Sequence, residues 1–337
     1  MFTLVAILSC GTPADPPAAT VGPALWTRPA DHFQVMGTVV DVELPEAAGA
    51  ADAVAAVHDV FADVEATANE WRAATALAEI NAHAGTPTPT PEPVRALLRR
   101  SLDVARTTDG AFDPTWAALW DQWDFRAETH VLPDPAVLAE RVKHIDWTRV
   151  VIDDDAGTVL LPDPGMKLGL GGIAKGWALD RSAAELRRRG FDDFVISAGG
   201  QVMAGGHKGD RPWRVGVRDP RGPREDAFAM VEVSDGSMST SGDYEHYFEL
   251  DGVRYHHILD PKTGWPAKGV RSASVLCPDA TLADGLSTAL VVLGVERGLA
   301  LAERLDDVEA VIVDDAGKVH TTSGVHDRLV VLHEPAP

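Results

Sequence analysis

The chain has 337 residues, of which 45% are hydrophobic and 24% charged, a composition that excludes a disordered or fibrous protein. Its 51 acidic residues outnumber its 30 Lys and Arg residues, and the formal net charge of -21 makes nucleic acid an unfavourable partner. A bound nucleotide would therefore need a metal ion, a helix N-terminus or local Lys and Arg side chains to offset the repulsion.

The N-terminal segment has the features of an export signal followed by a tether. An apolar run ends in ILSC at residues 7–10, which resembles the lipidation box of a lipoprotein signal peptide. We expect residues 1–9 to be the signal peptide and residues 10–24 to be a flexible tether that starts at a lipidated Cys10. No later apolar run reaches the about 20 residues of a membrane span. The expected protein is thus exported, faces the periplasm and meets the membrane only through its lipid anchor.

The next part of the chain is predicted to combine short strands with helices. Alternating apolar residues predict two short strands, or one bent strand, over residues 32–44. Helical spacing or helix-start signals predict helices over residues 47–68, 75–81, about 93–106 and 134–145. The stretch 109–123 is rich in aromatic and turn-forming residues and is expected to be irregular.

The second half is predicted to be mostly β-structure. Turn sequences between Val-, Ile- and Leu-rich arms predict hairpins at residues 153–157, 250–252 and 314–317. Two longer helices, about 172–189 and 279–293, interrupt the strands. Runs of strands with segregated helices indicate an α+β fold and not a doubly wound sheet. No linker follows residue 24, so residues 25–335 are expected to form a single unit of two fused lobes.

A glycine-rich segment, MKLGLGGIAKG at residues 166–176, leads into the first of these long helices. Glycines let a backbone approach a ligand closely, and a helix N-terminus offers N–H groups to phosphate. Lys175 adds positive charge beside them. The segment matches neither the Walker pattern nor a complete dinucleotide fingerprint, and such turns also serve purely for packing.

The second long helix carries a carboxylate and a hydroxyl on one face. Asp284 and Thr288 are four residues apart, so their side chains lie one turn apart. Hard oxygen ligands at this spacing suit Mg²⁺, which completes its shell with water and substrate phosphate. The alternative is structural: Asp284 is stabilised by the helix dipole, and Thr288 bonds back to a carbonyl.

The return arm of the hairpin at residues 250–252 contains two adjacent histidines, His256 and His257. Strand alternation through residue 259 would place them on opposite faces, so they cannot share a role. His257 falls among apolar residues, where burial would keep its imidazole neutral and able to accept a proton. A hydrogen-bonded core histidine is the alternative. A zinc pair is disfavoured, because the two side chains diverge and the chain's two cysteines lie in no spaced motif.

Taken in chain order, these segments and several weaker ones resemble the ApbE family of FAD:protein FMN transferases. The weaker ones include a possible stacking residue, Trp71, and a strand end that allows close backbone approach at residues 197–200. The matching segments are MGT at 36–38, NEW at 69–71, GAFDP at 110–114, GGIAKG at 171–176, AGG at 198–200, TSGDY at 240–244, HILDPKTG at 257–264 and ADGLST at 283–288.

The resemblance implies an ApbE-like, T-fold-like architecture with FAD bound in a cleft between the lobes and Mg²⁺ at its pyrophosphate. The catalytic residue would be His257. By matching positions, the FAD contacts would be Met36, Trp71, Ala111, Phe112, Asp113, Lys175 and Ile258. The metal ligands would be Asp284, Thr288 and a backbone oxygen of Gly172. One position departs from the family, because Gly169 stands where an aspartate usually precedes the Leu-Gly-Gly sequence.

The implied reaction transfers FMN to a threonine hydroxyl of an acceptor, a membrane redox subunit with an Asp/Ser-Gly-Ala-Thr type motif. His257 would take the hydroxyl proton, and AMP would leave. Two alternatives stay open. With water in place of threonine the chain would be an FAD pyrophosphatase, and with a purely structural metal site it would be a periplasmic flavin-binding lipoprotein.

Overall fold

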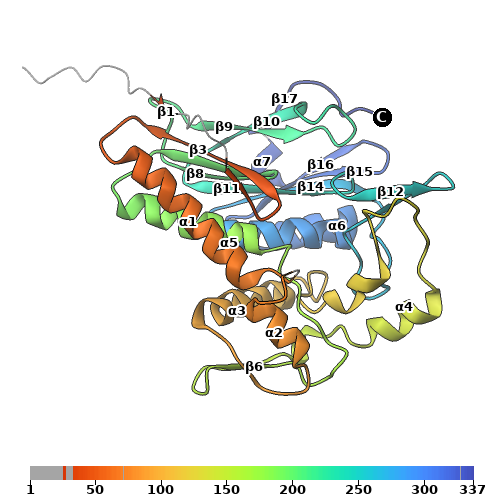
Figure 1. Ribbon diagram of the computed structural model, residues 1–337. Coiled ribbons are helices and arrows are strands. Elements are labelled where there is room, and N and C mark those ends of the chain that lie inside the picture. Colours follow the sequence, from red (N-terminus) through yellow and green to blue (C-terminus); the bar gives the residue numbers. More distant parts are fainter. Residues whose placement is uncertain (1–25, 28–32, 71, 327) are drawn as a thin grey trace, which may run out of the picture.

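The computed structural model describes residues 26–27, 33–70, 72–326 and 328–337 (Figure 1). The predicted signal peptide, lipidation site Cys10, tether and stacking residue Trp71 lie outside the described residues. Within the described part, strands and helices are segregated as in an α+β fold, which confirms the predicted class.

A nine-stranded antiparallel sheet forms the centre of the molecule. Its order is β1-β3-β7-β8-β11-β14-β15-β16, and β2 pairs with β3. The bounds are β1 Trp26–Thr27, β2 Phe33–Val35, β3 Thr38–Pro45, β7 Phe194–Ala198, β8 Gln201–Gly205, β11 Gly236–Gly242, β14 Val270–Cys277, β15 Glu309–Asp314 and β16 Val319–Thr321. Residues 33–44 thus form two strands, because positive φ angles at Met36 and Gly37 make a tight turn between them.

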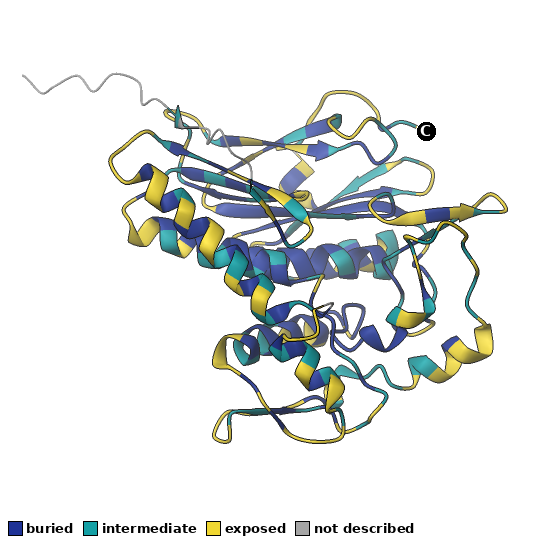
Figure 2. Ribbon diagram, viewed as in Figure 1, coloured by how far each residue is buried: buried dark blue, intermediate teal, exposed yellow. Residues whose placement is uncertain are grey.

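Three helices cover one face of this sheet (Figure 1): α1 Ala50–Ala68, α5 Ala174–Arg188 and α6 Ala280–Ala302. They begin and end within a few residues of the predicted ones, except that α6 continues beyond residue 293. Gly294 breaks the helical geometry there with φ 78°, so the predicted end marks a kink. By length and hydropathy α6 passes the test for a membrane span. Its packing against β11, β14 and α5 and its many buried residues are those of a core helix (Figure 2).

A smaller sheet lies over the opposite face of the large sheet. It contains β9 Trp213–Arg218, β10 Ala227–Val233 and β17 Val330–Val331, and the short helix α7 Ser323–His326 packs on β15. A separate hydrophobic cluster fills the space between the two sheets, with Trp213 and Phe228 packed against Leu276 and Val311.

The remaining elements lie beyond the helical layer, on the side away from the large sheet (Figure 1). They are α2 Ala76–Ala82, α3 Glu92–Thr107, α4 Pro135–Val142, the 3-10 helices η1 Ala117–Gln122 and η2 Trp147–Arg149, and a small sheet of β4 Thr88–Pro89, β5 Val151–Asp153 and β6 Thr158–Leu160. One hydrophobic cluster joins this region to the large sheet, since it contains Leu97 of α3, Phe61 of α1 and Ile196 of β7. The hairpin of β12 Tyr247–Leu250 and β13 Val253–His256 projects near the end of the sheet.

The three predicted hairpins are all present. Asp251 and Gly252 adopt the positive φ angles of a two-residue turn between β12 and β13. The other two connect β5 with β6 and β15 with β16. The two 3-10 helices were not expected, because their segments of six and three residues are too short to show a helical period.

Candidate active site

The glycine-rich segment forms a turn that ends against α6. The turn closes at Leu170, whose carbonyl accepts from the backbone N–H of Ile173 at 3.1 Å and of Ala174 at 2.9 Å. Gly176, in the first turn of α5, lies so close to α6 that an added Cβ would sit 2.2 Å from the Ala280 carbonyl oxygen. Only glycine permits this approach. The segment therefore packs two helices together, and it also brings its backbone to the predicted metal ligands.

Asp284 lies on α6 at this contact, with 2% of its surface exposed. Its Oδ2 accepts from the Gly176 backbone N–H at 3.0 Å, and its Oδ1 accepts from the Nε2 of Gln201. Burial raises the pKa of this carboxyl, and the positive charge of Lys175 opposes the shift. The carboxylate is thus held in a fixed orientation by donors from two other elements.

Thr288 lies one turn further along α6, on the same face. Its Oγ1 is 3.2 Å from the Oγ of Ser241 and 3.5 Å from the backbone oxygen of Asp284, the back-bond of the structural alternative. Gly172 faces this hydroxyl, because a Cβ built on Gly172 would lie 3.4 Å from Thr288 Oγ1. The three predicted metal-binding residues therefore lie together.

The two histidines differ as predicted, although the strand alternation used to separate them is wrong at this point. β13 ends at His256, so His257 no longer follows the strand alternation. After the strand, the backbone N–H of Ala267 donates to the carbonyl of Ile258. His256 is a buried structural residue whose Nε2 bonds to the Ala267 carbonyl at 2.8 Å. His257 is partly exposed, and its buried Nδ1 has no hydrogen-bond partner.

Burial, followed by the charges of His246 and His256, lowers the pKa of His257 to about 3. The imidazole is therefore neutral at physiological pH, as predicted. Its ring meets that of His246 edge-on, with the centroids 5.3 Å apart. Burial, followed by the charge of Arg126, also lowers the pKa of His246.

Lys175 is the group common to all three parts of the site. Its charge acts on the carboxyl of Asp284 and on the imidazoles of His257 and His246. It also acts on Glu70, a buried carboxyl whose pKa is raised by burial. The charge of Lys175 therefore reaches Asp284 of α6, the hairpin histidine His257 and the carboxyl beside the glycine-rich turn.

Three residues of this centre were not singled out from the sequence: Gln201, Glu70 and His246. Glu70 lies against the glycine-rich turn, because a Cβ on Gly171 would be 3.2 Å from its Oε1, and the nearby backbone of Gly171 and Leu170 opposes the rise in its pKa. It stands in the NEW segment, which was the one sequence signal for it. Gln201 directly follows the AGG segment, and His246 had no signal.

Of the predicted flavin contacts in the GAFDP segment, two are buried apolar residues and one is a carboxylate bonded within its own loop. Phe112 is buried beside the glycine-rich turn, with its Cε2 3.4 Å from a Cβ built on Gly172. Ala111, the preceding residue, is also buried. The carboxylate of Asp113 is used within its own loop, where Oδ1 accepts from Thr115 N–H at 2.8 Å and Oδ2 from Trp147 N–H at 3.2 Å. Asp113 also lines a cavity of about 350 Å³ together with Trp147.

The last two predicted contacts flank the centre. Met36 is part of the β2–β3 turn, which packs against the AGG segment, since a Cβ on Gly199 would lie 2.4 Å from Thr38 Oγ1. Ile258, next to His257, is buried in the cluster beneath α6.

Gly169, the departure from the family, lies under an indole. The Nε1 of Trp116 donates to the Gly169 carbonyl at 3.1 Å, and a Cβ on Gly169 would lie 2.7 Å from that same nitrogen. Trp116 therefore occupies the space that any side chain at position 169 would enter. Tight aromatic packing therefore fills the position where the resemblance implies a carboxylate.

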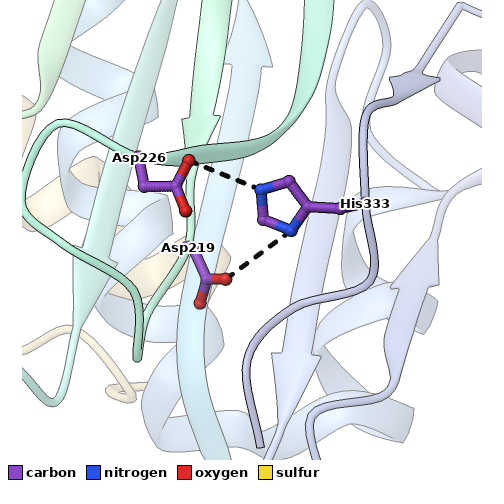
Figure 3. A group of neighbouring side chains, drawn as sticks. All are labelled: Asp219, Asp226 and His333. Atoms are coloured by element: carbon purple, nitrogen blue, oxygen red, sulfur yellow. Dashed lines mark ion pairs between the residues drawn. The ribbon is translucent and has the colours of Figure 1, made fainter.

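A second group of metal-ligand residues, Asp219, Asp226 and His333, lies near the C-terminus (Figure 3). Its ligand atoms are within 4.8 Å of one another. However, Asp219 already accepts from three backbone N–H groups, including that of Ala336 at 2.8 Å. His333 pairs with Asp226 at 3.4 Å. This group holds the C-terminal segment to the end of β9, and we call it the C-terminal latch.

Comparison with known proteins identifies relatives for most of the chain. Residues 36–312 match a family described as the ApbE family. The FAD:protein FMN transferase of Treponema pallidum is 37% identical over 317 residues, which are 88% of this chain and 88% of that protein.

Two solved structures have the same fold. The ApbE protein of Thermotoga maritima superimposes with a TM-score of 0.82 at 32% identity, over 90% of this chain and 99% of that one. The flavin transferase ApbE of Vibrio cholerae gives 0.80 at 28% identity, over 91% and 100%.

Proposed function

The chain belongs to the ApbE family and is an FAD:protein FMN transferase, and from this premise we propose how its residues divide the reaction. FAD is the substrate, and a second protein is the acceptor. The observation that supports the proposal is that the charge of Lys175 acts both on the imidazole of His257 and on the buried carboxyl of Asp284.

We propose that Asp284, Thr288 and the backbone oxygen of Gly172 hold Mg²⁺. The fit rests on the donor set, because a carboxylate, a hydroxyl and a carbonyl are the hard oxygen ligands that Mg²⁺ prefers. Buried Asp284 accepts only neutral N–H donors at hydrogen-bond distance, so its negative charge is available to a cation. When bound, the ion would neutralise the charge of the FAD pyrophosphate and polarise the phosphorus that is attacked.

His257 is proposed to accept the proton of the acceptor threonine. The threonine oxygen forms a bond to the FMN-side phosphorus, the bond to the AMP oxygen breaks, and the proton passes to the imidazole. In the free protein a pKa of about 3 keeps His257 neutral, so its lone pair is available. A bound diphosphate would raise this pKa, because a nearby negative charge favours the imidazolium. The histidine would thus become a stronger base when substrate is present.

Lys175 is proposed to bind the pyrophosphate. Its Nζ donates to the carbonyl oxygen of Gly171, in the glycine-rich turn, at 3.4 Å. The acidic chain needs such local charge to accept FAD. The helix dipole at the start of α5 would add positive potential at this end of the helix.

Incubation with FAD, Mg²⁺ and an acceptor domain carrying an Asp/Ser-Gly-Ala-Thr type motif tests this proposal. The expected result is flavin fluorescence that stays with the acceptor after denaturation, together with one AMP per transfer. Replacement of the motif threonine by valine should remove the label. Free FMN and AMP without labelling would indicate a pyrophosphatase, and the absence of turnover would indicate a flavin-binding protein.

We also propose that the protein is an exported lipoprotein anchored through Cys10. Support comes from the ILSC sequence and the tether-like composition that follows it. Expression in a bacterial host with labelled palmitate should label the wild type and not the Cys10→Ser variant. A soluble, unlabelled wild type in the periplasm or cytoplasm would contradict the anchor.

A further inference from the structure

Gln201 is a buried amide in the predicted metal centre that has one unused oxygen. It is 3% exposed, and its Nε2 donates to Oδ1 of Asp284. Its Oε1 is buried and has no hydrogen-bond partner. A buried carbonyl oxygen without a donor destabilises a fold unless a ligand or water meets it. The unused oxygen therefore indicates a missing partner at this position.

The orientation of this amide follows from its neighbour. If the amide were reversed, Oε1 would face the carboxylate of Asp284, and two acceptors would repel each other. Nε2 must therefore face Asp284 while the carboxylate is ionised. Oε1 is then fixed on the other side of the amide.

The backbone of Gln201 is fixed as well. It is the first residue of β8 and pairs with Ala198 of β7 on one side and with Ser239 of β11 on the other. The preceding Gly199 and Gly200 make the turn from β7 with φ angles of 55° and 87°. An amide on a central strand is a rigid support for a ligand of another element.

The neighbouring strand supports the second ligand of α6 in the same way. Ser241 of β11 bonds to the hydroxyls of Ser287 at 2.8 Å and Thr288 at 3.2 Å. Gln201 holds Asp284, and Ser241 holds Thr288. The large sheet thus orients both oxygen ligands that α6 presents.

We propose that Gln201 belongs to the metal centre, where Nε2 orients Asp284 and Oε1 accepts a hydrogen bond from a water molecule of the cation's shell. This inference rests on the proposed Mg²⁺ site. Mg²⁺ keeps several of its waters in proteins, and these waters need acceptors. Partners of this outer kind change metal affinity by about 10–100-fold when they are removed.

Direct Mn²⁺ binding tests the proposal without turnover. Free Mn²⁺ is measured by electron paramagnetic resonance in titrations of the full chain, alone and with FAD, with no acceptor present. Gln201→Leu should weaken Mn²⁺ binding by about 10–100-fold. Gln201→Glu should bind Mn²⁺ at least as tightly as the wild type, because its carboxylate adds an anionic oxygen beside the cation. Its melting temperature should also rise more on Mn²⁺ addition, because two facing carboxylates destabilise the metal-free protein.

Ser237→Ala is the matched control, because Ser237 loses one buried hydrogen bond, to the Cys277 carbonyl at 2.9 Å, on a neighbouring strand. It should bind Mn²⁺ like the wild type. Equal weakening in Gln201→Leu and Gln201→Glu, or wild-type affinity in Gln201→Leu, would overturn the proposal for Gln201. Asp284→Ala separates this failure from that of the metal site itself. If the wild type binds Mn²⁺ no better than Asp284→Ala, the metal assignment fails for both.

Discussion

The candidate active site around Asp284 and His257 and the C-terminal latch both combine carboxylates with nearby imidazole or amide groups. They differ in whether their polar atoms have hydrogen-bond partners within the fold. In the latch, Asp219 accepts from three backbone N–H groups and His333 pairs with Asp226. In the active site, two buried polar atoms, Gln201 Oε1 and His257 Nδ1, have no partner.

The pKa shifts follow the same division. Burial raises the pKa of Asp284 and lowers that of His257, so in both groups burial disfavours the charged form. In the latch, burial alone would raise the pKa of Asp219, but its three backbone N–H donors lower the pKa overall. The pKa of His333 is raised. A cluster whose charges are paired and whose polar atoms are hydrogen-bonded within the fold needs no ligand. A cluster that buries polar atoms without hydrogen-bond partners, and in which burial disfavours the charged forms, is organised to bind a ligand.

The largest expected effect comes from removing the unpartnered imidazole. His257→Ala should lower the rate of FMN transfer by about 10²–10⁴-fold, the usual contribution of a general base. FAD binding, measured by quenching of flavin fluorescence, should change little, because the proposed diphosphate contacts come from other residues. Retained transfer would remove His257 from the reaction, and lost FAD binding would make it a binding residue. His256→Ala is an informative comparison, since His256 supports the Ala267 carbonyl and its loss should first lower stability.

The position of this centre shows how far the sequence can predict a site. Most helix ends and the hairpins follow from local chemistry, since capping and positive φ depend on a few adjacent residues. The predicted helix end at residue 293 corresponds to a real break at Gly294. Helical spacing alone placed Asp284 and Thr288 on one face of the helix, whereas their role as metal ligands was implied by the family resemblance and stays a prediction.

Gln201 could not be predicted in this way. Its bond to Asp284 joins positions 83 residues apart, and only the sheet order that places β8 beside β11 brings the two together. The packing at Gly169 could not be predicted either, because Trp116, which occupies the space beside Gly169, is 53 residues away in the sequence. Contacts between distant segments depend on register, which local periodicity does not determine.

The second expected effect is the contribution of His257 to the pH dependence of stability. Its pKa is about 3 in the folded protein and 6.5 in the reference state, so the unfolded chain binds the proton first as the pH falls. The free energy of unfolding should therefore decrease below pH 6.5, by up to about 1.4 kcal/mol per pH unit from this group. Urea unfolding of the wild type and His257→Ala, compared from pH 8 downward, should show the difference. Parallel curves would contradict the burial of this imidazole.

The third expected effect tests the packing that replaces the family aspartate. Gly169→Asp should destabilise the protein by about 1–3 kcal/mol, because the new Cβ would overlap Trp116. The double variant Gly169→Asp with Trp116→Ala should be more stable than the sum of the single variants predicts. Thermal and urea unfolding of all four proteins measure this coupling. Additive effects would mean that Trp116 does not restrict position 169.

The smallest expected effect lies in the latch. The hydrogen bond with the Glu334 carbonyl and the pairing with Asp226 raise the pKa of His333 above its usual 6.5. A raised pKa means that the charged form stabilises the fold, so this contribution is complete below pH 6.5 and is lost as the pH rises through the folded value. His333→Gln should therefore lower the melting temperature slightly at acidic pH and not at alkaline pH, and salt should reduce the difference. Zn²⁺ or Mn²⁺ that stabilised the wild type and not His333→Gln would show instead that the latch is a metal site, and the distinction between satisfied and unsatisfied clusters would fail.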